Sequence, residues 1–551
     1  MPGLQDLPAE LLKQTLFYFV PRVSPQWEIW HEFRTGQLKP NPSDEDEDED
    51  EYDEESLDSL YNICLVSKKF RDIAQPLLFS NFVDDGALGN ISETVRFANC
   101  LYRYPQLGQF VQEITMGNPL IFDSESAEED DLELSEEEIQ LYTAPIKALG
   151  LGIEEEKWIS ALKNRDILVF AALIVNKTPN VRRLVLPGTI SSVNPFPELF
   201  QQNPSFLRRL ENLGLAGLKE SEGYDYASYH EFFALPSLKI VMFDNGDLQK
   251  RTCPSTWEPR TFNIEELLFR DSVVDAVSLG RLIGACKNLK AFLLDNFKAH
   301  QEWVDHPNGG SLFNAADAHQ ALLAHKDTLE ISPERGHDLQ DWQRFLSSRA
   351  KMGSLREFSV LRDIRLQQAI VSVHPQFPPT LKRLFITDCN SSVINLVKNI
   401  AKDTKKGLYP DFNEFRMLAV DITQPVQLPG QRIPEGKTPE QAHQALVDLF
   451  KGTKVDFFIG PFDMPSMDEL MNGYDEDDEF DDEMAYDSEG YEIEDPIMDA
   501  LRGMRLGDAG GGGRGGGPNG PMPPGLLEYF MQRAMQDPDF AHLHPPSRRN
   551  R

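Results

Sequence analysis

Residues Leu381–Cys389 read LKRLFITDC, and this stretch decides the fold class. Its apolar residues Leu381, Leu384 and Ile386 occupy the first, fourth and sixth positions of the stretch. Alternate side chains of an extended strand point to the same face, so the fourth and sixth residues share a face that can be buried. The stretch therefore predicts a short strand with one apolar face.

The same frame, apolar-x-x-apolar-x-apolar, recurs along residues 181–420. Its second residue is charged in all eight copies, where a charged content of 26% gives roughly two by chance. Successive copies start 25 to 34 residues apart, except for one interval of 66 residues that leaves room for a degenerate copy around Thr328–Ile331 and an insertion. The eight copies are Val181–Leu186, Leu210–Leu215, Leu238–Phe243, Ile264–Phe269, Leu289–Leu294, Leu355–Val360, Leu381–Ile386 and Phe415–Val420.

A period near 26 to 29 residues is typical of a solenoid, in which each unit supplies a strand and a helix. Segments such as Val277–Cys286 and Val393–Ile400 fit the helix. Neither half of a unit buries its apolar face alone, so stacked units are expected to form a curved parallel sheet with helices on its convex side. Scattered strands of an ordinary α/β domain are the alternative.

The stretch LKRLFITDC also matches the leucine-rich repeat pattern LxxLxLxxN/C in full, and the other frames match mainly its first six positions. The chain thus resembles leucine-rich-repeat proteins. The resemblance implies an α/β fold in which residues 95–460 form a leucine-rich-repeat solenoid, a curved parallel sheet with outer helices, interrupted by an acidic loop at 120–140.

The net charge of −35 is concentrated in three runs. Ser43–Asp58, Asp123–Glu138 and Asp468–Asp495 hold 37 of the 89 Asp and Glu and no Lys or Arg, and the remaining 52 acids nearly balance the 54 bases. Such runs cannot form a core and are expected to be disordered. Because phosphate contacts need clustered Lys and Arg, neither nucleic acid nor an anionic membrane is expected as a partner.

The sequence favours an intracellular protein, cytoplasmic or nuclear, without a catalytic site. Its longest apolar stretch, Ile167–Val175, is half the length of a membrane span, and the start of the chain lacks the features of a signal peptide. The five cysteines are far apart and fit small buried apolar residues. No HExxH, GxxxxGK[ST] or GxSxG motif occurs, so we expect no enzyme activity, no metal and no cofactor.

Two apolar segments near the N-terminus predict a small helical module over residues 1–82. In Leu7–Phe19, apolar residues recur at helical spacing, and Pro8 suits the first turn of the helix. Leu57–Phe82 carries a second stripe, and Ser67 is expected to cap a further helix that Pro76 stops. The intervening segment, 21–56, reads as a disordered acidic insertion.

These segments resemble an F-box, the three-helix module that docks onto the adaptor subunit of SCF-type cullin-RING ubiquitin ligases. The resemblance departs from the family in one respect, because a family F-box is normally continuous. A plain N-terminal cap on the solenoid is the alternative from the residues alone. The residues that carry the resemblance, and that it implies would bind the adaptor, are Leu7, Pro8, Leu11, Leu12, Leu65, Val66, Phe70, Pro76 and Leu77.

An F-box ahead of leucine-rich repeats implies a substrate-recognition receptor of such a ligase, with an unknown target protein held by the repeats. The receptor would promote protein ubiquitination by positioning its target and would need no catalytic residue. The alternative is an acidic leucine-rich-repeat scaffold or chaperone that binds basic proteins such as histones.

Between the second and third inward residues of each frame lies one outward position, and it is mostly apolar. An apolar column down an exposed sheet normally marks a binding surface. We therefore expect target-binding residues at Met242, Leu268, Leu293 and Phe385, whereas shielding by long neighbouring side chains is the competing interpretation. Residues 461–551 are expected to be a disordered acidic and Gly-rich tail with a short helix at 526–536.

Overall fold

The computed structural model describes residues 7–20, 48–84, 91–117, 134–150, 154–188, 193–203, 205–217, 224–244, 246–248, 253, 257–270, 272–295, 315–335, 350–389, 391–419, 432–433 and 435–461. The chain divides into two compact units, Met1–Phe462 and Asp463–Arg551. All described residues belong to the first unit, so the helix expected at 526–536 lies outside the described residues.

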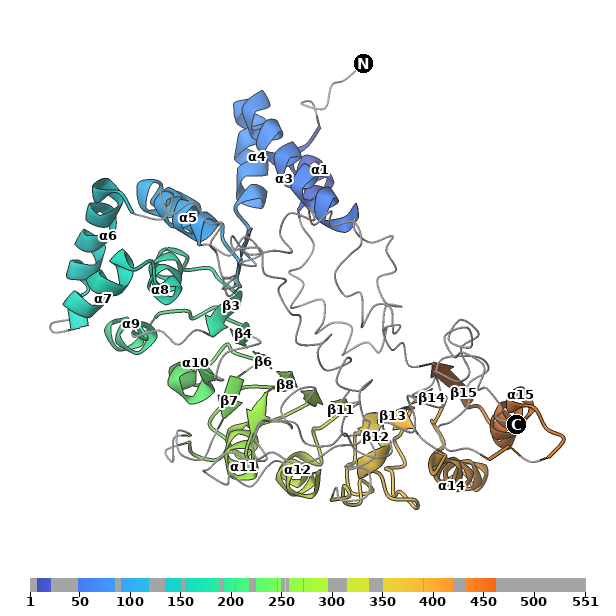
Figure 1. The fold of residues 1–551 in the computed structure, drawn as a ribbon. Coiled ribbons are helices and arrows are strands. Elements are labelled where there is room, and N and C mark those ends of the chain that lie inside the picture. The colour runs from blue at the N-terminus through green and yellow to red at the C-terminus, as the bar shows by residue number, and fades with distance from the viewer. Residues whose placement is uncertain are drawn as a thin grey trace, which may run out of the picture. The chain divides into compact units, whose positions relative to one another are not determined.

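A parallel sheet of 12 strands organises this unit (Figure 1). Its strands follow one another in chain order, except that three strands of a smaller sheet intervene in the sequence. Parallel neighbours require a crossover between them, and helices supply most of these crossovers. The strands are β1 (Asn81–Asp84), β2 (Glu113–Met116), β3 (Arg183–Gly188), β4 (Asn212–Gly217), β6 (Ile240–Asp244), β8 (Glu266–Arg270), β10 (Ala291–Asp295), β11 (Ile331–Arg335), β12 (Asp363–Gln367), β13 (Arg383–Cys389), β14 (Glu414–Ala419) and β15 (Asp456–Pro461).

The helices lie on one side of the sheet (Figure 1), where strand and helix side chains share one large apolar core. The prediction of an α/β fold is confirmed, and the expected helices near 277–286 and 393–400 are α11 and α14. The helices that follow β1 are α5 (Ser92–Arg103), α6 (Glu136–Ala148), α7 (Glu154–Lys163), α8 (Ile167–Lys177), α9 (Phe196–Gln202), α10 (His230–Phe233), α11 (Ala276–Ala285), α12 (Ala315–Leu322), α14 (Val393–Lys405) and α15 (Pro439–Val447). Short 3-10 turns are η3 (Pro105–Gln109), η5 (Tyr226–Tyr229), η6 (Leu323–His325), η7 (Gln368–Ile370) and η8 (Asp448–Phe450).

The fourth and sixth residues of the frames point into this core, as expected. In β13 these residues are Leu384 and Ile386, which are fully buried and pair in register with Phe415 and Met417 of β14. The degenerate copy near 328–331 is also present, because Ile331 opens β11. Six of the eight predicted frames coincide with strands in their predicted register, at β3, β4, β6, β8, β10 and β13.

Two frames were placed wrongly. Leu355–Val360 forms a turn, and the strand is β12, whose frame is Leu361–Leu366. The second error is one of register: Leu384 pairs with Phe415, so the frame of β14 is Phe412–Met417. Both errors arise because the apolar pattern is permissive, so several overlapping stretches of sequence match it. Only the pairing with neighbouring strands selects one of them.

Three further strands, β1, β2 and β15, were not predicted. The β2 frame has the neutral Gln112 at its second position. It was missed because the frames were recognised by a charged residue at that position.

The most apolar stretch of the chain, Ile167–Val175, lies in α8, and all nine of its side chains are buried. A helix that is apolar on every side has to be surrounded by protein, and α8 packs against α5, α7, α9 and β3. The Asp166 carboxylate caps it by accepting from the Leu168 backbone N–H at 3.0 Å. Among the described residues, no helix is both long and apolar enough to cross a bilayer.

A second, three-stranded parallel sheet is formed by β5 (Tyr224–Asp225), β7 (Gly246–Leu248) and β9 (Val273–Val274). The buried Tyr226 hydroxyl lies 2.6 Å from the Ser272 hydroxyl. Gly246 has to be glycine here, because a Cβ atom at this position would lie 2.7 Å from the Tyr226 ring. This small sheet therefore depends on a close approach of a backbone to an aromatic ring.

The N-terminal helices are α1 (Ala9–Leu16), α3 (Asp48–Val66) and α4 (Lys68–Leu78), with the short turn η2 (Phe17–Phe19). They have a separate core of Leu16, Val20, Leu60, Cys64, Ala74 and Leu77. Ser67 caps α4 as predicted, accepting from the Phe70 N–H at 3.2 Å. Pro76, however, lies inside α4 and does not stop it; the helix ends two residues later.

Two acidic runs differ from the expectation of disorder. Residues 21–47 lie outside the described residues, but α3 already begins at Asp48, within the predicted insertion 21–56. Likewise α6 begins at Glu136, within the predicted acidic loop, where Ser135 and Glu138 form a capping box. Carboxylates are favoured in the first turn of a helix because they face its unpaired N–H groups and positive end. A charge run can therefore be the start of a helix.

Candidate protein-interaction surfaces

The predicted adaptor-binding residues divide into exposed and buried sets. Leu7, Pro8, Leu11, Leu65 and Val66 are exposed, with Leu11 48%, Leu65 59% and Val66 68% accessible. Leu12 and Leu77 are buried, while Phe70 and Pro76 are half-buried. The exposed set can contact a partner directly, whereas the buried leucines can act only by supporting the helices.

Several contacts bring the exposed set together at the start of α1 and the junction of α3 with α4. The Lys69 ammonium group donates to the Leu7 carbonyl at 2.9 Å, so Leu7 lies beside the first turn of α4. Leu65 and Val66 end α3 immediately before the cap residue Ser67. The Arg71 guanidinium donates to the Cys64 carbonyl at 3.2 Å and fixes that end of α3.

Four large exposed side chains of this module were not among the predicted site residues: Phe17, Tyr18, Leu57 and Tyr61. A signal was present for Tyr61, because Leu57, Tyr61 and Leu65 recur every four residues. The structure buries Leu60 and Cys64 and exposes this neighbouring stripe. The apolar face of α3 is thus wider than the core that it covers, and we call Leu7, Leu11, Tyr61, Leu65 and Val66 the helical apolar surface.

The predicted target-binding column is placed differently from expectation. Met242, Leu268 and Leu293 were expected to be exposed, but each is at most 2% accessible. They form a second apolar cluster with Val185, Ala291 and Ile331 on the sheet face opposite the main core. A Cβ atom at Gly214, within the same column, would lie 3.0 Å from Val185 and 3.2 Å from Met242, so the column is tightly packed.

Phe385 is only half-buried and belongs to a different arrangement. In register order, the column continues through Arg365, Phe385, Arg416 and Phe458 on β12 to β15. The Arg365 guanidinium lies 4.9 Å from the Phe385 ring centroid, and that of Arg416 lies 5.2 Å from the Phe458 centroid. Phe458 is 48% accessible. The sequence frames missed this Arg–Phe ladder because the β14 register was wrong by three residues.

Carboxylates hold Arg383 and also Arg416 of the ladder. Arg383 donates to both Asp363 oxygens, at 2.6 and 2.8 Å. Arg416 bonds Glu414 at 3.0 Å and Asp456 at 3.1 Å. The hydrogen bond to Asp363, opposed by burial, raises the pKa of the Arg383 guanidinium. A bidentate pair of this kind fixes the guanidinium plane and leaves it unable to rotate toward a ligand.

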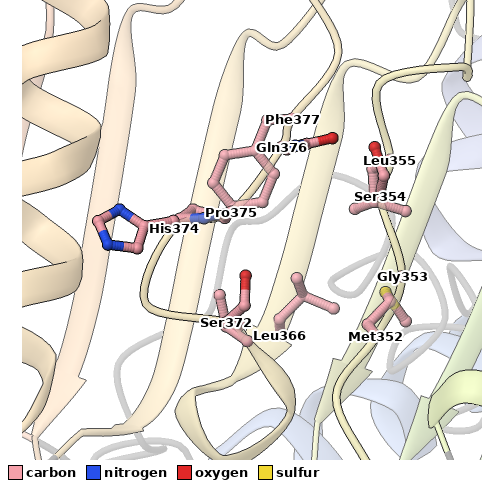
Figure 2. Close-up of a pocket in the computed structure, with 11 residues that line it drawn as sticks. Met352, Gly353, Ser354, Leu355, Leu366, Ser372, His374, Pro375, Gln376 and Phe377 are labelled. Carbon is pink, nitrogen blue, oxygen red and sulfur yellow. The ribbon is translucent and has the colours of Figure 1, made fainter.

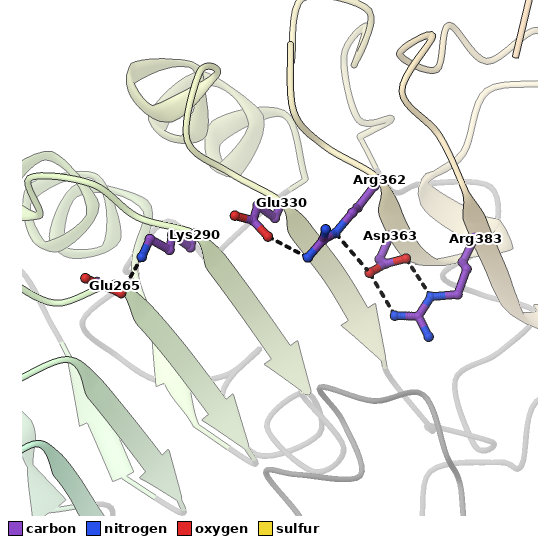
Figure 3. A network of polar contacts seen from close by, with 6 residues as sticks. All are labelled: Glu265, Lys290, Glu330, Arg362, Asp363 and Arg383. Carbon is purple, nitrogen blue, oxygen red and sulfur yellow. Dashed lines mark hydrogen bonds and ion pairs between the residues drawn. The ribbon is translucent and has the colours of Figure 1, made fainter. Parts of the chain in front are cut away.

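A row of charges runs along the starts of the strands (Figure 3), and it explains why the second frame position is charged. Each residue of the row donates its backbone N–H to the carbonyl of the preceding one, as in Lys239 to Glu211 and Glu265 to Lys239. Adjacent strands lie about 4.8 Å apart, so opposite charges in neighbouring units attract and like charges repel. In order the row is Gln112, Arg182, Glu211, Lys239, Glu265, Lys290, Glu330, Arg362, Lys382 and Asn413.

The sign alternates from Arg182 through Arg362. Lys290 bonds Glu265 at 2.7 Å, and Arg362 bonds Glu330 at 2.7 Å (Figure 3). The hydrogen bond that Lys290 donates to the Glu265 carboxylate raises the pKa of Lys290. Lys382 ends the alternation, because its two neighbours in the row are Arg362 and Asn413.

A hollow of about 310 Å³ opens at this break. Its described lining carries three cationic groups and two carboxylates. These residues are Arg362, Asp363, Lys382, Arg383, Asn413 and Glu414.

A second pocket, of about 270 Å³, lies between the segments 352–355 and 371–377 (Figure 2). Apolar side chains such as Leu366 and Phe377 line it with Ser372, and the His374 ring lies at one edge. Of its described lining residues, His374 alone is titratable. A single imidazole without a paired nucleophile or carboxylate is a weak basis for catalysis.

Other groups that could carry chemistry are held in structural roles. Four cysteines are buried and Cys100 is half-buried, and all are free. Burial raises the thiol pKa of Cys64, Cys100, Cys253 and Cys286, which disfavours the reactive thiolate. In the part of the chain that the structure describes, no three His, Cys, Asp or Glu side chains gather as a metal site would need.

No protein-family model matches the chain, and a search of curated proteins gives no significant match. The two surfaces described above therefore rest on the residues and their geometry.

Proposed function

We propose that this protein is the substrate receptor of an SCF-type cullin-RING ubiquitin ligase. In this proposal α1, α3 and α4 form an F-box-like module that docks to the adaptor, and the sheet with its outer helices is a leucine-rich-repeat solenoid that holds the target. One observation carries it: a three-helix module with its own small core keeps Leu11, Leu65 and Val66 largely exposed.

The exposure of these side chains favours docking over a plain cap. A cap would bury its spare apolar residues against the sheet that it covers, yet the helical apolar surface is open in the presence of that sheet. Burying one large apolar side chain contributes about 1.5–3 kcal/mol, so three or four of them supply enough free energy for a specific interface. Exposed apolar side chains of a helix typically lie in an apolar groove of the partner.

The chemistry would reside in other subunits. A receptor that holds a target beside a charged conjugating enzyme raises the effective concentration of the target lysine. This arrangement needs two separate surfaces on one chain, and the structure offers the helical apolar surface and the ladder on β12 to β15.

A binding measurement with the purified adaptor subunit tests the proposal. We expect full-length protein to bind it and the double variant Leu11→Ala, Val66→Ala to lose at least tenfold in affinity, because two anchors cost about 1–2 kcal/mol each. Leu408→Ala is the matched control, since Leu408 is as exposed as Leu11, at 49% against 48%, but lies beside the last turn of α14.

Either of two results would contradict the proposal. One is the absence of adaptor binding by the unmodified chain, and the other is equal binding by the double variant. Affinity capture from cell extract should in addition recover the cullin adaptor. Recovery of core histones in its place would favour the acidic scaffold.

A further inference from the structure

We infer that the face of β12 to β15 opposite the helices is a docking site for an extended acidic peptide whose carboxylate lies at Lys382 and whose large apolar side chain lies on Phe385 or Phe458. This inference concerns the target side of the proposed function and takes its biological role from it. The binding itself involves none of the helical apolar surface.

The break in the charge row identifies the subsite for the carboxylate. From Arg182 to Arg362 each charge of the row stands beside an opposite charge in at least one neighbouring unit. Lys382 stands between Arg362, which already bonds Glu330, and the neutral Asn413 (Figure 3 shows the Arg362 contacts). Arg383 lines the same hollow, but its guanidinium group is already hydrogen-bonded to Asp363. One carboxylate from a partner would complete the alternation of signs.

Asn413 adds a second contact to this subsite. Its side chain lines the hollow next to Lys382 and is exposed. A carboxylate accepts hydrogen bonds at two oxygens, so it can take one from an ammonium and one from an amide group. The three cationic groups of the hollow outnumber its two carboxylates, and these are already paired, Asp363 with Arg383 and Glu414 with Arg416, so the hollow favours an anion over a cation.

The ladder supplies the apolar half of the site. Lys382 immediately precedes β13, and Phe385 lies within that strand three residues later, a separation of about 10 Å. Phe458 lies two strands away, again at about 10 Å from Phe385, and half of its surface is open. A peptide in the extended polyproline II conformation advances about 3.1 Å per residue and has three residues per turn, so side chains three positions apart lie on the same side of it. In that conformation an acidic residue three positions before a large apolar residue matches the spacing from Lys382 to Phe385.

The charge of Lys382 makes this face selective, because Arg416 is already paired with Glu414 and Asp456. Arg365 lies over the Phe385 ring and Arg416 over the Phe458 ring. A basic peptide would place a like charge against Lys382, which is unfavourable. An acidic peptide gains from the same charge, and the gain falls with salt.

Fluorescence anisotropy with the purified full-length chain tests the inference. The probe is the fluorescein-labelled peptide GSEDSFGSGS, in which a glutamate precedes the phenylalanine by three positions. Its controls are GSQNSFGSGS, without charge, and GSEDSSGSGS, without the aromatic ring. We expect the probe to bind more tightly than either control and to weaken as the salt concentration rises.

Matched variants locate the site. Lys382→Gln should weaken binding of the probe about three- to tenfold, the range of a typical net hydrogen-bond contribution, while Lys382→Arg should retain most of the binding. Lys239→Gln is the control, since Lys239 occupies the same row position but stands between Glu211 and Glu265. Phe458→Ser should weaken the binding of the probe and leave the binding of GSEDSSGSGS unchanged.

Three outcomes would overturn the inference: no binding of the probe, equal binding of the uncharged control, or equal losses in Lys382→Gln and Lys239→Gln. The last would mean diffuse attraction to the whole surface. These results are independent of adaptor binding, because the adaptor is absent from the assay and Lys382 is remote in sequence from α1, α3 and α4. Thermal unfolding of each variant confirms that it is folded.

Discussion

The Lys69 ammonium group donates a 2.9 Å hydrogen bond to the backbone carbonyl of Leu7, which is 62 residues earlier in the chain. This contact joins the start of α1 to the start of α4 across residues 21–47. Together with the buried Leu16, Leu60 and Leu77, it makes one small module from segments that are far apart in sequence. The insertion therefore does not prevent the three helices from packing together.

Leu11 and Leu12 are adjacent leucines with opposite environments, and they should respond oppositely to truncation. Leu12→Ala removes a fully buried side chain, and we expect it to lower the free energy of unfolding of the helical module by about 2–5 kcal/mol. Leu11→Ala removes an exposed one and should cost less than about 0.5 kcal/mol. Hydrogen exchange of α1 and α4 amides measures both. Similar losses in the two variants would show that the helix is rotated from the orientation described.

The second apolar cluster should behave as core. Leu268→Ala should destabilise the sheet by about 2–5 kcal/mol, because Leu268 is fully buried among Val185, Met242 and Leu293. Phe385→Ala, on the half-buried ladder, should cost less. Urea unfolding followed by circular dichroism compares them. Near-native stability of Leu268→Ala would restore the exposed column that the sequence predicted.

Gly246 and Tyr226 should be coupled. Gly246→Ala places a methyl group against the Tyr226 ring, and we expect a loss of about 1–3 kcal/mol from overpacking. Tyr226→Leu removes part of that ring, so the double variant should lose less than the sum of the single variants. Denaturant unfolding of all four proteins gives the coupling free energy. Strict additivity would rule out the close approach.

Ser135 should stabilise α6 through its capping box. Its hydroxyl accepts from the Glu138 N–H at 3.3 Å, and its own N–H donates to the Glu138 carboxylate at 2.9 Å. Ser135→Ala should cost about 0.5–2 kcal/mol. Ser160→Ala, at an exposed interior position of α7, is the control and should be neutral or slightly stabilising. Equal effects of the two substitutions on the melting temperature would argue against the cap.

His325 should make the sheet sensitive to mild acid. Its Nε2 bonds the Ile283 carbonyl at 2.8 Å, and its Nδ1 accepts from the Leu289 N–H at 3.3 Å, which requires the neutral ring. Burial lowers the pKa of His325, and the bond to the Ile283 carbonyl only partly offsets this. The unfolded chain thus binds the proton more readily, so this contribution to stability is complete above about pH 6.5 and is lost progressively below it.

Comparison with His325→Gln isolates this effect from the other titrating groups. The fall in melting temperature between pH 7.5 and pH 5.5 should be smaller in the variant than in the unmodified protein. An identical fall in both would show that His325 does not titrate in this range.

Most strands of the sheet could be predicted from the local periodicity of the sequence, but which side chains are exposed could not. The strand containing Leu384 and Ile386 was predictable because its apolar residues are two apart and its charged Lys382 recurs in other units. The positions of β12 and β14 were not, since choosing among overlapping frames needs the pairing of Leu384 with Phe415, a contact between strands. The burial of Met242 was missed because neighbouring side chains, and not alternation within one strand, close that face.

The candidate surfaces show the same division. Leu11 and Leu65 were singled out by apolar stripes and Val66 by the resemblance to an F-box, and the structure exposes all three. Leu12 belongs to the same stripe but is core, because a stripe cannot tell which of its residues face the neighbouring helix. Lys382 was visible only as one charged position among eight. Its significance depends on Arg362 and Asn413 being its neighbours across the sheet.

The alternating row also gives the array of units a parity. Excising the single unit that contains β6 would set Glu211 beside Glu265, and excising the one that contains β8 would set Lys239 beside Lys290, each a juxtaposition of like charges. Excising both units together would set Glu211 beside Lys290 and restore attraction. Between Arg182 and Arg362, the sheet should therefore tolerate the loss or gain of two units better than the loss or gain of one. Deletion variants can test this, because removing an odd number of units should lower the stability more than removing an even number.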